Sequence, residues 1–343
     1  MESDKKSHVV RDVGRFGGAL RPAAAWLCVP ALAGCAGVQS ALNPAGPNAA
    51  AINFTGWIMI AGATAIFLLV MVLAAVAAFA PDRVRWLGRR GLVVGGGLAF
   101  PIVALSSLLA YEFSFGGHLT RGDGEPLRIA VVGERWWWRV RYLDENGGAQ
   151  ATSANEVHMP TGRPVEFVLT SPNVIHSFWI PSLGGKLDMI PGRENRFTLQ
   201  ADRTGTYRGV CAEYCGEQHA LMAFSVVVHE PAEFDRWLAR ESEPAAEPAD
   251  ERLLRGRQAF IDWGCGACHA IQGTEAAGII GPDLTHVGGR LTLGAGTLPN
   301  NASTLARWIA RNQEIKPENL MPPFDMLPDE ELTALAAYLE SLK

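Results

Sequence analysis

The 343-residue sequence has little charge for its length. Asp, Glu, Lys and Arg together make up 19% of the residues, and the net charge is a mild −5. No basic stripe of the kind that follows a phosphate backbone runs through the chain, so nucleic acid is not expected as a partner. The hydrophobic fraction of 48% is high for a wholly soluble protein, and the excess lies near the N-terminus.

Cysteine is scarce as well, with six residues in the whole chain. They fall into three pairs, Cys28 and Cys35, Cys211 and Cys215, and Cys265 and Cys268. Each of the two later pairs stands close to a histidine, which indicates a metal or cofactor site rather than a disulfide framework.

The first 34 residues predict a signal peptide. Basic residues from Lys5 to Arg21 precede an apolar stretch, Ala23 to Ala33, that is too short to cross a bilayer and ends in small residues. The sequence Leu32-Ala33-Gly34-Cys35 also resembles a bacterial lipoprotein cleavage box, in which Cys35 would carry the lipid. Cleavage nearby without lipid, or no cleavage, are the alternatives.

Two longer apolar segments predict a transmembrane hairpin within residues 50–115. The first, about 54–80, contains no charged residue, and the second, about 91–113, is interrupted only by Pro101. Each is long enough to cross about 30 Å of hydrocarbon as a helix. Four arginines between 83 and 90 place the connecting loop in the cytoplasm, so that the chain on either side faces outward. A buried hairpin in a soluble protein is the alternative.

From Leu127 to Glu230, short β-branched and aromatic runs alternate with turn signals, which predicts an all-β sandwich or barrel in a domain of residues 121–240. The candidate strands are 128–142, 164–170, 194–200, 206–210 and 222–229. An amphipathic helix is predicted over 231–240. Residues 241–250 contain prolines and like charges but no large apolar residue, so we expect an extended linker that cannot join a core. A last domain, 251–343, follows.

The stretch Cys211 to Met222, CAEYCGEQHALM, places two thiolates, an imidazole and a thioether within twelve residues. These soft ligands favour copper over structural zinc, which would have no use for Met222. A second cysteine at CxxxC spacing is surplus in a site with one copper, so the pattern favours two coppers bridged by both thiolates. The candidate for the second histidine is His176, in a loop after a strand. The alternative is a disulfide between Cys211 and Cys215, with His219 at the surface.

One histidine about thirty-five residues before CxExCGxxHxxM closely resembles the binuclear CuA centre of cytochrome c oxidase subunit II. The resemblance implies that His176 and His219 each bind one copper. It further implies that Cys211 and Cys215 bridge the two ions and that Met222 is a weak axial ligand. The fold would be cupredoxin-like, with the copper loop joining the last two strands.

The resemblance extends beyond these ligands. The backbone carbonyl of Glu213 would be the other axial ligand, and its carboxylate would reach a magnesium ion shared with subunit I. Trp136-Trp137-Trp138 matches the family's aromatic cluster, in which the first tryptophan is the surface point where electrons enter, so we expect Trp136 in that role. Adjacent tryptophans on one strand must alternate faces, with at least one in the core and one exposed. Arg139 and Arg141 replace acidic or neutral residues of the family, which argues against docking of an external basic cytochrome. We expect His158 and His229 to be structural or exposed, not ligands.

The sequence CGACH in the last domain is a CxxCH motif, the attachment signature of c-type haem. Cys265 and Cys268 would form the thioethers, and His269 would be the proximal iron ligand. A sixth ligand is expected some fifty residues on, where the sequence LMPP around Met321 resembles the methionine loop of class I-like cytochromes c. Met321 is the candidate, and Met326 is the fallback. A zinc site or a redox-active CxxC is the alternative, but the domain has no second cysteine pair.

Taken in order, the segments resemble subunit II of a caa-type cytochrome c oxidase: a two-helix transmembrane hairpin, an all-β cupredoxin-like sandwich with CuA, and an all-α class I-like cytochrome c domain. Electrons would pass from haem c to CuA and on to subunit I, where oxygen is reduced to water and protons are pumped. This chain itself would carry no oxygen-reducing site.

The resemblance also implies a location and partners. The chain would lie in a bacterial inner membrane, with its copper and haem domains on the outer side. Its partners would be subunit I and other oxidase subunits, membrane lipid, and an electron-donating cytochrome or quinol-oxidising complex.

Two other functions would use single motifs of this chain. A nitrous oxide reductase-like CuA protein would have a second copper-rich domain and no transmembrane hairpin. A membrane-anchored copper chaperone would use Cys211 and Cys215 as transient ligands, but it would not need Met222, the tryptophans or a haem.

Overall fold

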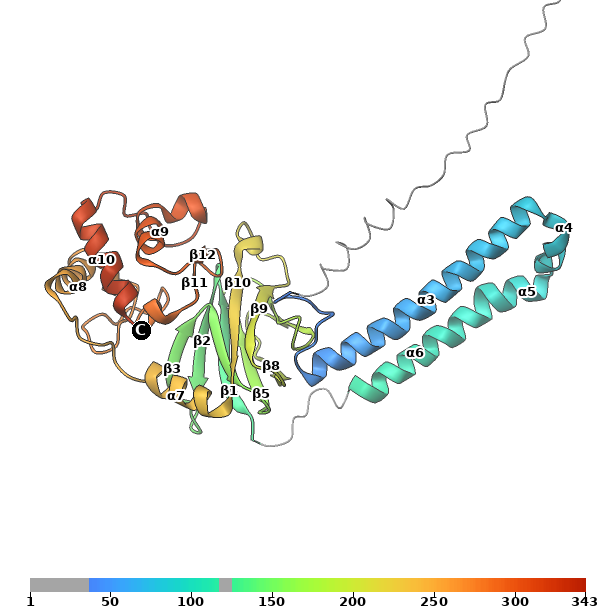
Figure 1. Cartoon of the computed structure of the whole chain (residues 1–343), viewed down its shortest axis with the longest axis horizontal. Coiled ribbons are helices and arrows are strands. Elements are labelled where there is room, and N and C mark those ends of the chain that lie inside the picture. The colour runs from blue at the N-terminus through green and yellow to red at the C-terminus, as the bar shows by residue number, and fades with distance from the viewer. Residues whose placement is uncertain (1–36, 117–124) are drawn as a thin grey trace, which may run out of the picture. The chain divides into compact units, whose positions relative to one another are not determined.

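The computed structural model describes residues 37–116 and 125–343 (Figure 1). The predicted signal peptide, Cys28 and Cys35 lie outside the described residues, as do the first residues of the predicted 121–240 domain. The described chain forms a helical hairpin, a β-sandwich and a mainly helical C-terminal domain, in that order. These parts confirm the fold class predicted from the sequence.

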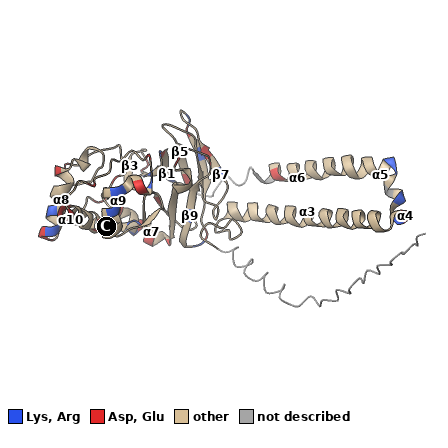
Figure 2. Ribbon diagram, turned by 90° about the horizontal axis from the view of Figure 1, so that it is seen from above, with Lys and Arg blue, Asp and Glu red and all other residues tan. Residues whose placement is uncertain are grey.

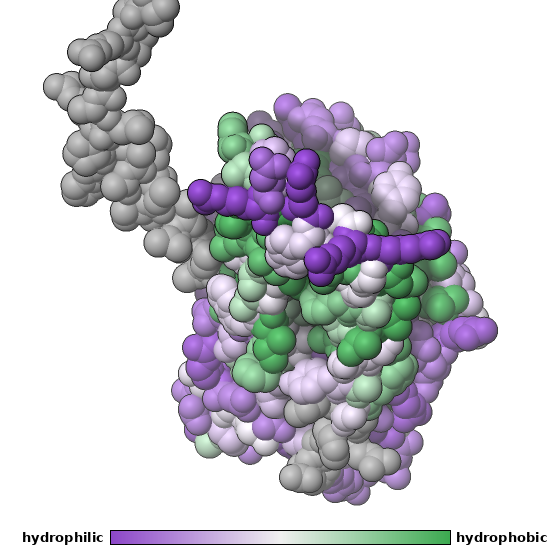
Figure 3. Space-filling view, turned by 90° about the vertical axis from the view of Figure 1, so that its right-hand side faces the viewer, coloured by the Kyte–Doolittle hydropathy of each residue, from purple (hydrophilic) through white to green (hydrophobic). Residues whose placement is uncertain are grey.

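Two long helical segments form the hairpin. α3 (Pro47–Phe79) begins at a proline, whose missing N–H is not needed in the first turn, and ends just before Pro81. The return consists of α4 (Pro81–Val84), η1 (Arg85–Gly88), α5 (Arg90–Val94), η2 (Gly95–Ala99) and α6 (Phe100–Gly116). Pro47–Phe79 and Arg90–Ser114 are both long and apolar enough to cross a membrane. Basic side chains gather at the tip near α4 and α5, whereas the helix flanks are apolar (Figure 2, Figure 3).

The β-sandwich consists of two five-stranded sheets. One has the order β3-β2-β1-β5-β8 and the other β4-β10-β9-β6-β7, and each contains one parallel pair, β1 with β5 and β4 with β10. The strands are β1 (Leu127–Glu134), β2 (Trp137–Leu143), β3 (Ala149–Ala154), β4 (Glu156–Pro160), β5 (Val165–Thr170), β6 (His176–Trp179), β7 (Lys186–Met189), β8 (Asn195–Leu199), β9 (Gly205–Cys211) and β10 (Ala223–His229). Alternate residues of β1 are buried, as expected for a strand with one face on the core.

The prediction of one strand over 128–142 is wrong. The chain reverses between Glu134 and Trp137, which lie opposite each other, so β1 and β2 pair as an antiparallel hairpin. A single strand there would exceed the usual length of roughly 3–10 residues. Trp136 lies in this reversal, and its indole N–H donates to the carbonyl of Cys215 at 2.9 Å.

The three tryptophans alternate in burial, as expected. Trp136 is 6% exposed and Trp138 is fully buried, whereas Trp137 between them is half-buried, so the partly exposed tryptophan is Trp137 and not Trp136. The sequence patterns also do not predict β3, β4, β6 or β7, which are short or polar. One consequence is that His176 is the first residue of β6 and not a loop residue.

Aromatic rings fill the core next to the copper loop, Cys211–Met222. Phe178 and Phe224 stack with centroids 4.9 Å apart, and Trp138 lies 5.0 Å from Phe224. All three side chains are buried, and burial of each contributes roughly 1.5–3 kcal/mol. Because close-packed protein cores deform little, these rings hold the copper loop in a rigid position.

The C-terminal domain follows α7 (Pro231–Glu241), which confirms the predicted amphipathic helix and buries Phe234. Its elements are α8 (Glu251–Asp262), η4 (Cys265–Ala267), η5 (Val287–Gly289), β11 (Thr292–Leu293), β12 (Leu298–Pro299), α9 (Ala302–Ile315) and α10 (Asp329–Ser341). Asp250 caps the start of α8 by accepting from the N–H of Leu253, and Asn301 forms a capping box on α9.

Residues 241–250 are attached to the C-terminal domain. The N–H of Ala245 donates to the carbonyl of Gln272 at 2.9 Å, and Ala245 packs against the domain core. The ring of His286 donates to the carbonyl of Glu243 at 3.0 Å. The expectation that this segment cannot join a core is therefore wrong, because a small side chain with backbone hydrogen bonds is sufficient.

Candidate copper centre and haem pocket

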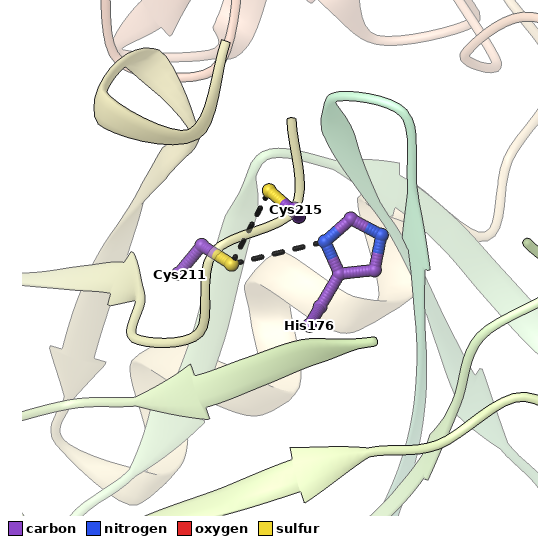
Figure 4. A group of neighbouring side chains, drawn as sticks. All are labelled: His176, Cys211 and Cys215. Carbon is purple, nitrogen blue, oxygen red and sulfur yellow. Dashed lines mark hydrogen bonds between the residues drawn. The ribbon is translucent and has the colours of Figure 1, made fainter. Parts of the chain in front are cut away.

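The copper loop joins β9 to β10, as predicted. The N–H of Cys211 donates to the carbonyl of Met222 at 2.9 Å, which closes the loop at its base. His176 reaches the loop because β6 pairs with β9, with Phe178 opposite Cys211. The structure thereby brings His176, Cys211 and Cys215 into one group whose ligand atoms lie within 4.8 Å of one another (Figure 4).

The ligand atoms form two similar halves. Nδ1 of His176 lies 3.7 Å from Sγ of Cys211, and Nδ1 of His219 lies 3.7 Å from Sγ of Cys215. Sδ of Met222 lies 3.9 Å from Sγ of Cys215. The two Sγ atoms are 3.7 Å apart, far beyond the roughly 2.05 Å of a disulfide bond. This arrangement fits two soft metal ions with the thiolates between them.

Glu213 contributes to the site through its backbone. Its carbonyl oxygen lies 3.2 Å from Sγ of Cys211. Its carboxylate points elsewhere and accepts from Nζ of Lys186 at 3.3 Å, while the same ammonium lies 3.2 Å from Asp188. The carbonyl therefore belongs to the copper loop, and the carboxylate belongs to a neighbouring ion-pair cluster.

The two thiols of the loop have pKa values shifted in opposite directions. The bond from the Cys215 thiol, helped by the ring of His176, lowers the pKa of Cys211 to about 3. The same bond to Cys211, together with burial, raises the pKa of Cys215. Both shifts come from the close contact of the two sulfur atoms, and metal binding would release the protons that the thiols hold.

His176 is held by packing. Its ring is fully buried, and Nε2 has no hydrogen-bond partner in the described part of the chain. The ring of Trp138 lies 6.2 Å away between centroids. Gly133 of β1 leaves room on another side, since a Cβ there would come within 2.8 Å of the imidazole. A side chain at position 133 would therefore displace the ring whose Nδ1 faces Cys211.

A cavity of about 320 Å³ opens in the C-terminal domain. Its largely apolar wall includes Cys265, Cys268, His269 and Met321, so the four predicted haem residues are brought together. Two thiols, an imidazole and a thioether around an apolar cavity fit a c-type haem. The fallback ligand Met326 is 63% exposed and does not line the cavity.

The axial candidates are oriented by neighbouring residues. Nδ1 of His269 donates to the carbonyl of Pro282 at 2.7 Å, which leaves Nε2 available for iron. Burial lowers the pKa of His269 and so favours the neutral ring that a metal needs. At Gly281 a Cβ would come within 2.5 Å of this ring, so only glycine fits. The Met321 carbonyl accepts from Nε2 of Gln313 at 2.9 Å, which anchors the methionine loop.

Trp136 touches both sites. Its indole N–H donates to the carbonyl of Cys215, and its side chain lines the haem cavity. Because it is only 6% exposed, it does not lie at the surface as expected; the C-terminal domain covers it. Its carbonyl accepts from Nζ of Lys316 at 2.7 Å. Sequence reasoning did not find Lys316, whose only signal is its place just before the methionine loop.

The other predicted residues of the sandwich have structural surroundings. Nε2 of His158 lies 2.8 Å from Glu156, and its Nδ1 lies 2.7 Å from His229, so neither histidine joins the metal-ligand group. Arg139 bonds to Glu134 and donates to the carbonyl of Ile279 at 2.9 Å. It therefore contacts the C-terminal domain of its own chain.

Comparisons with known proteins match both domains. Residues 143–229 match the family "Cytochrome C oxidase subunit II, periplasmic domain", and residues 253–343 match the family "Cytochrome c". The cytochrome c oxidase subunit 2 of Alkalihalophilus pseudofirmus is 42% identical over 215 residues, or 63% of this chain and 61% of that protein. That of Bacillus subtilis is 33% identical over 229 residues, or 64% of this chain and 63% of that protein. The chain thus spans less than two thirds of the length of these curated relatives.

Among solved structures, the periplasmic domain of subunit II of cytochrome oxidase (CoxB) of Bradyrhizobium japonicum is 30% identical. It covers 36% of this chain and 96% of its own, with a TM-score of 0.32.

The described chain joins a β-sandwich, with soft metal ligands gathered in one loop, to a mainly helical domain with a c-type haem motif, and it has two helices suited to a membrane. Its two family matches lie in the order that a cytochrome c oxidase subunit II with a fused C-terminal cytochrome c domain would have.

Proposed function

We propose that the chain is the electron-transfer subunit of a respiratory cytochrome c oxidase. It accepts electrons at its cytochrome c domain, passes them to its copper loop and delivers them to subunit I. There, oxygen is reduced to water and protons are pumped. The observation that carries the proposal is Trp136, which bonds to the Cys215 carbonyl of the copper loop and also lines the haem cavity.

The copper loop would hold a binuclear CuA centre. Its ligands would be His176, Cys211, the carbonyl of Glu213, Cys215, His219 and Met222. Support comes from the matched contacts of each histidine Nδ1 with one cysteine sulfur and from the separation of the two sulfurs. Cys265 and Cys268 would attach the haem, with His269 and Met321 as axial ligands. Bound copper and haem would supply reversible one-electron transfer.

The Glu213 carboxylate would also bind a magnesium ion shared with subunit I. Nζ of Lys186 lies 3.3 Å from Oε2 of this carboxylate, so the ammonium would have to move when the magnesium ion binds. Glu213→Gln in the assembled oxidase should then lower the magnesium content and leave copper unchanged. Equal magnesium content in the variant and the parent would rule this role out.

The hairpin would anchor the chain in a bacterial inner membrane beside subunit I, other oxidase subunits and lipid. The arginines at the hairpin tip would lie in the cytoplasm, and both metal domains would face outward, toward a donor cytochrome or a quinol-oxidising complex. In intact cells, a membrane-impermeant thiol reagent should fail to label Arg85→Cys. Labelling there would reverse the proposed orientation.

The copper proposal is tested by metal content and electron paramagnetic resonance of the detergent-purified chain. We expect two copper ions per chain and the hyperfine pattern of one unpaired electron shared by two copper nuclei. Cys215→Ser should abolish this pattern, because a bridging thiolate serves both ions. Glu217→Gln, an exposed position of the same loop, is the matched control and should preserve it. A single copper per chain in the parent would contradict the proposal.

A further inference from the structure

Lys316 is a buried cation between the C-terminal domain and the copper loop. The residue is only 2% exposed. Its Nζ donates to three backbone carbonyls, those of Trp136 at 2.7 Å, Leu221 at 3.0 Å and Gly294 at 3.3 Å. Two of these carbonyls belong to the β-sandwich and one to its own domain, so the full set of partners exists only where the two domains meet.

Burial of an ammonium is costly unless its protons are hydrogen-bonded. The cost is visible at Lys316, whose pKa is lowered by burial to about 7. Any other register of the two domains would separate this ammonium from its two partners in the sandwich, the carbonyls of Trp136 and Leu221. A buried, bonded cation therefore specifies one docking position more strictly than apolar contact would.

Lys316 is also tied to both metal sites. It directly follows α9 and begins the loop that carries Met321, which Gln313 anchors from the last turn of the helix. On the other side, the Lys316 ammonium holds the carbonyl of Trp136, and the indole of that residue donates to Cys215. The methionine loop and the copper loop are thus joined through two side chains.

Three further contacts hold the same interface. The N–H of Ala223, directly after Met222, donates to the carbonyl of Ala295 at 3.0 Å. The N–H of Leu291 donates to the carboxylate of Glu156 at 2.8 Å. Arg139 bonds to the carbonyl of Ile279. Contacts at separate points fix an orientation, whereas a flexible tether would only keep the domains near each other.

We propose that Lys316 is the positioning residue that holds the cytochrome domain in one position on the copper loop. Electrons would then pass from haem to copper in this single arrangement of the two domains. This inference rests on the proposed function of the two domains and adds how they are held. In this arrangement the cytochrome domain does not diffuse on a linker but stays at a fixed interface. The Lys316 side chain determines the relative position of the two domains at that interface.

The test compares the parent oxidase complex with Lys316→Met, which keeps the aliphatic stem but has no donor. Lys343→Met, an exposed lysine of the same domain, is the matched control. Hydrogen exchange is measured at the amides of Ala223 and Leu291, which donate hydrogen bonds across the interface. Flash-induced electron transfer from haem to copper is measured on the same samples. Copper content and the haem spectrum, unchanged in both variants, show that the two domains remain folded.

In Lys316→Met, we expect hydrogen exchange at both amides to become faster by about tenfold or more. We expect electron transfer from haem to copper to become slower by about tenfold or more. Both effects follow because the hydrogen bonds from a charged donor are lost. Lys343→Met should match the parent. Exchange equal to the parent at both amides would overturn the inference, even if electron transfer slowed. Faster exchange with an unchanged rate would also overturn it. If the parent shows no haem-to-copper transfer, the proposed function fails, and the exchange data still decide whether Lys316 holds the interface.

Discussion

The copper ligands are part of a packed core, whereas the haem ligands stand around a cavity. Cys211, Cys215 and Met222 are 6%, 4% and 1% exposed and belong to the core of the sandwich. The cavity of about 320 Å³ beside His269 and Met321 is partly open, and Trp136 of the sandwich also lines it. Its largely apolar wall has no packing partner of its own, whereas the copper ligands are packed without a metal. We therefore expect the haem to contribute more to the stability of its domain than copper does to the stability of the sandwich.

The largest effect is expected when one cofactor is removed at a time, because each domain should then respond only to the loss of its own cofactor. The double variant Cys265→Ser with Cys268→Ser cannot attach haem, so the C-terminal domain should lose its cooperative structure while the sandwich still binds copper. Limited proteolysis should then cleave the chain after about residue 251 and leave the sandwich intact.

The reciprocal control is Cys215→Ser, which should lose the copper pair without opening the C-terminal domain to protease. A haem-free chain whose C-terminal domain stays protease-resistant would break the comparison, because the cavity would then be tolerated empty.

A smaller effect is expected at the methionine loop. Met321→Leu should leave the haem covalently attached but remove the thioether ligand, which lowers the reduction potential and changes the absorption spectrum. Met326→Leu, at a side chain that is 63% exposed, is the matched control and should change neither property. If Met326→Leu had the effect and Met321→Leu did not, the ligand assignment would be wrong.

The smallest effect concerns Glu241, a buried carboxyl at the end of α7. Burial raises its pKa, and the nearby charges of Arg290, His286 and His158 oppose this, while that of Glu156 adds to it. Because the folded chain holds the proton to higher pH than the unfolded chain, this group stabilises the fold most at low pH. Its contribution is lost as pH rises through the raised pKa, above the ordinary value of 4.5.

Glu241→Gln should therefore reduce the fall in melting temperature as pH rises from about 4.5 toward neutrality. Thermal unfolding of the detergent-purified chain at several pH values measures this slope. Glu243→Gln, an exposed carboxyl of the same segment, should leave the slope as in the parent. A steeper fall in Glu241→Gln would contradict the sign of the pKa shift.

Sequence motifs predict what lies close together along the chain. The two cysteines, the histidine and the methionine of the copper loop occur within Cys211–Met222, and CxxCH is shorter still, so spacing alone indicates the chemistry. Composition and periodicity predict the hairpin and the sandwich in their order, and the CxxCH motif with its resemblance to cytochromes c predicts the last domain.

Contacts between distant residues were not predictable in the same way. Lys316 bonds to Trp136, 180 positions away, through a backbone carbonyl that any residue would offer, so no pattern marks the pair. Trp136, in the reversal of the chain before Trp137, bonds to Cys215, 79 positions on, and no local pattern indicates this contact. The predicted linker is likewise held by Gln272 and His286, which local composition does not reveal.

The most direct test of the account is the rate at which the copper loop is reduced after flash reduction of the haem, measured over a range of protein concentrations. The account predicts a rate that is independent of concentration, because donor and acceptor belong to one chain, and that is strongly slowed in Trp136→Ala, because this side chain links the haem cavity to Cys215. A rate that rises with concentration, or one that is unchanged in Trp136→Ala, would contradict it.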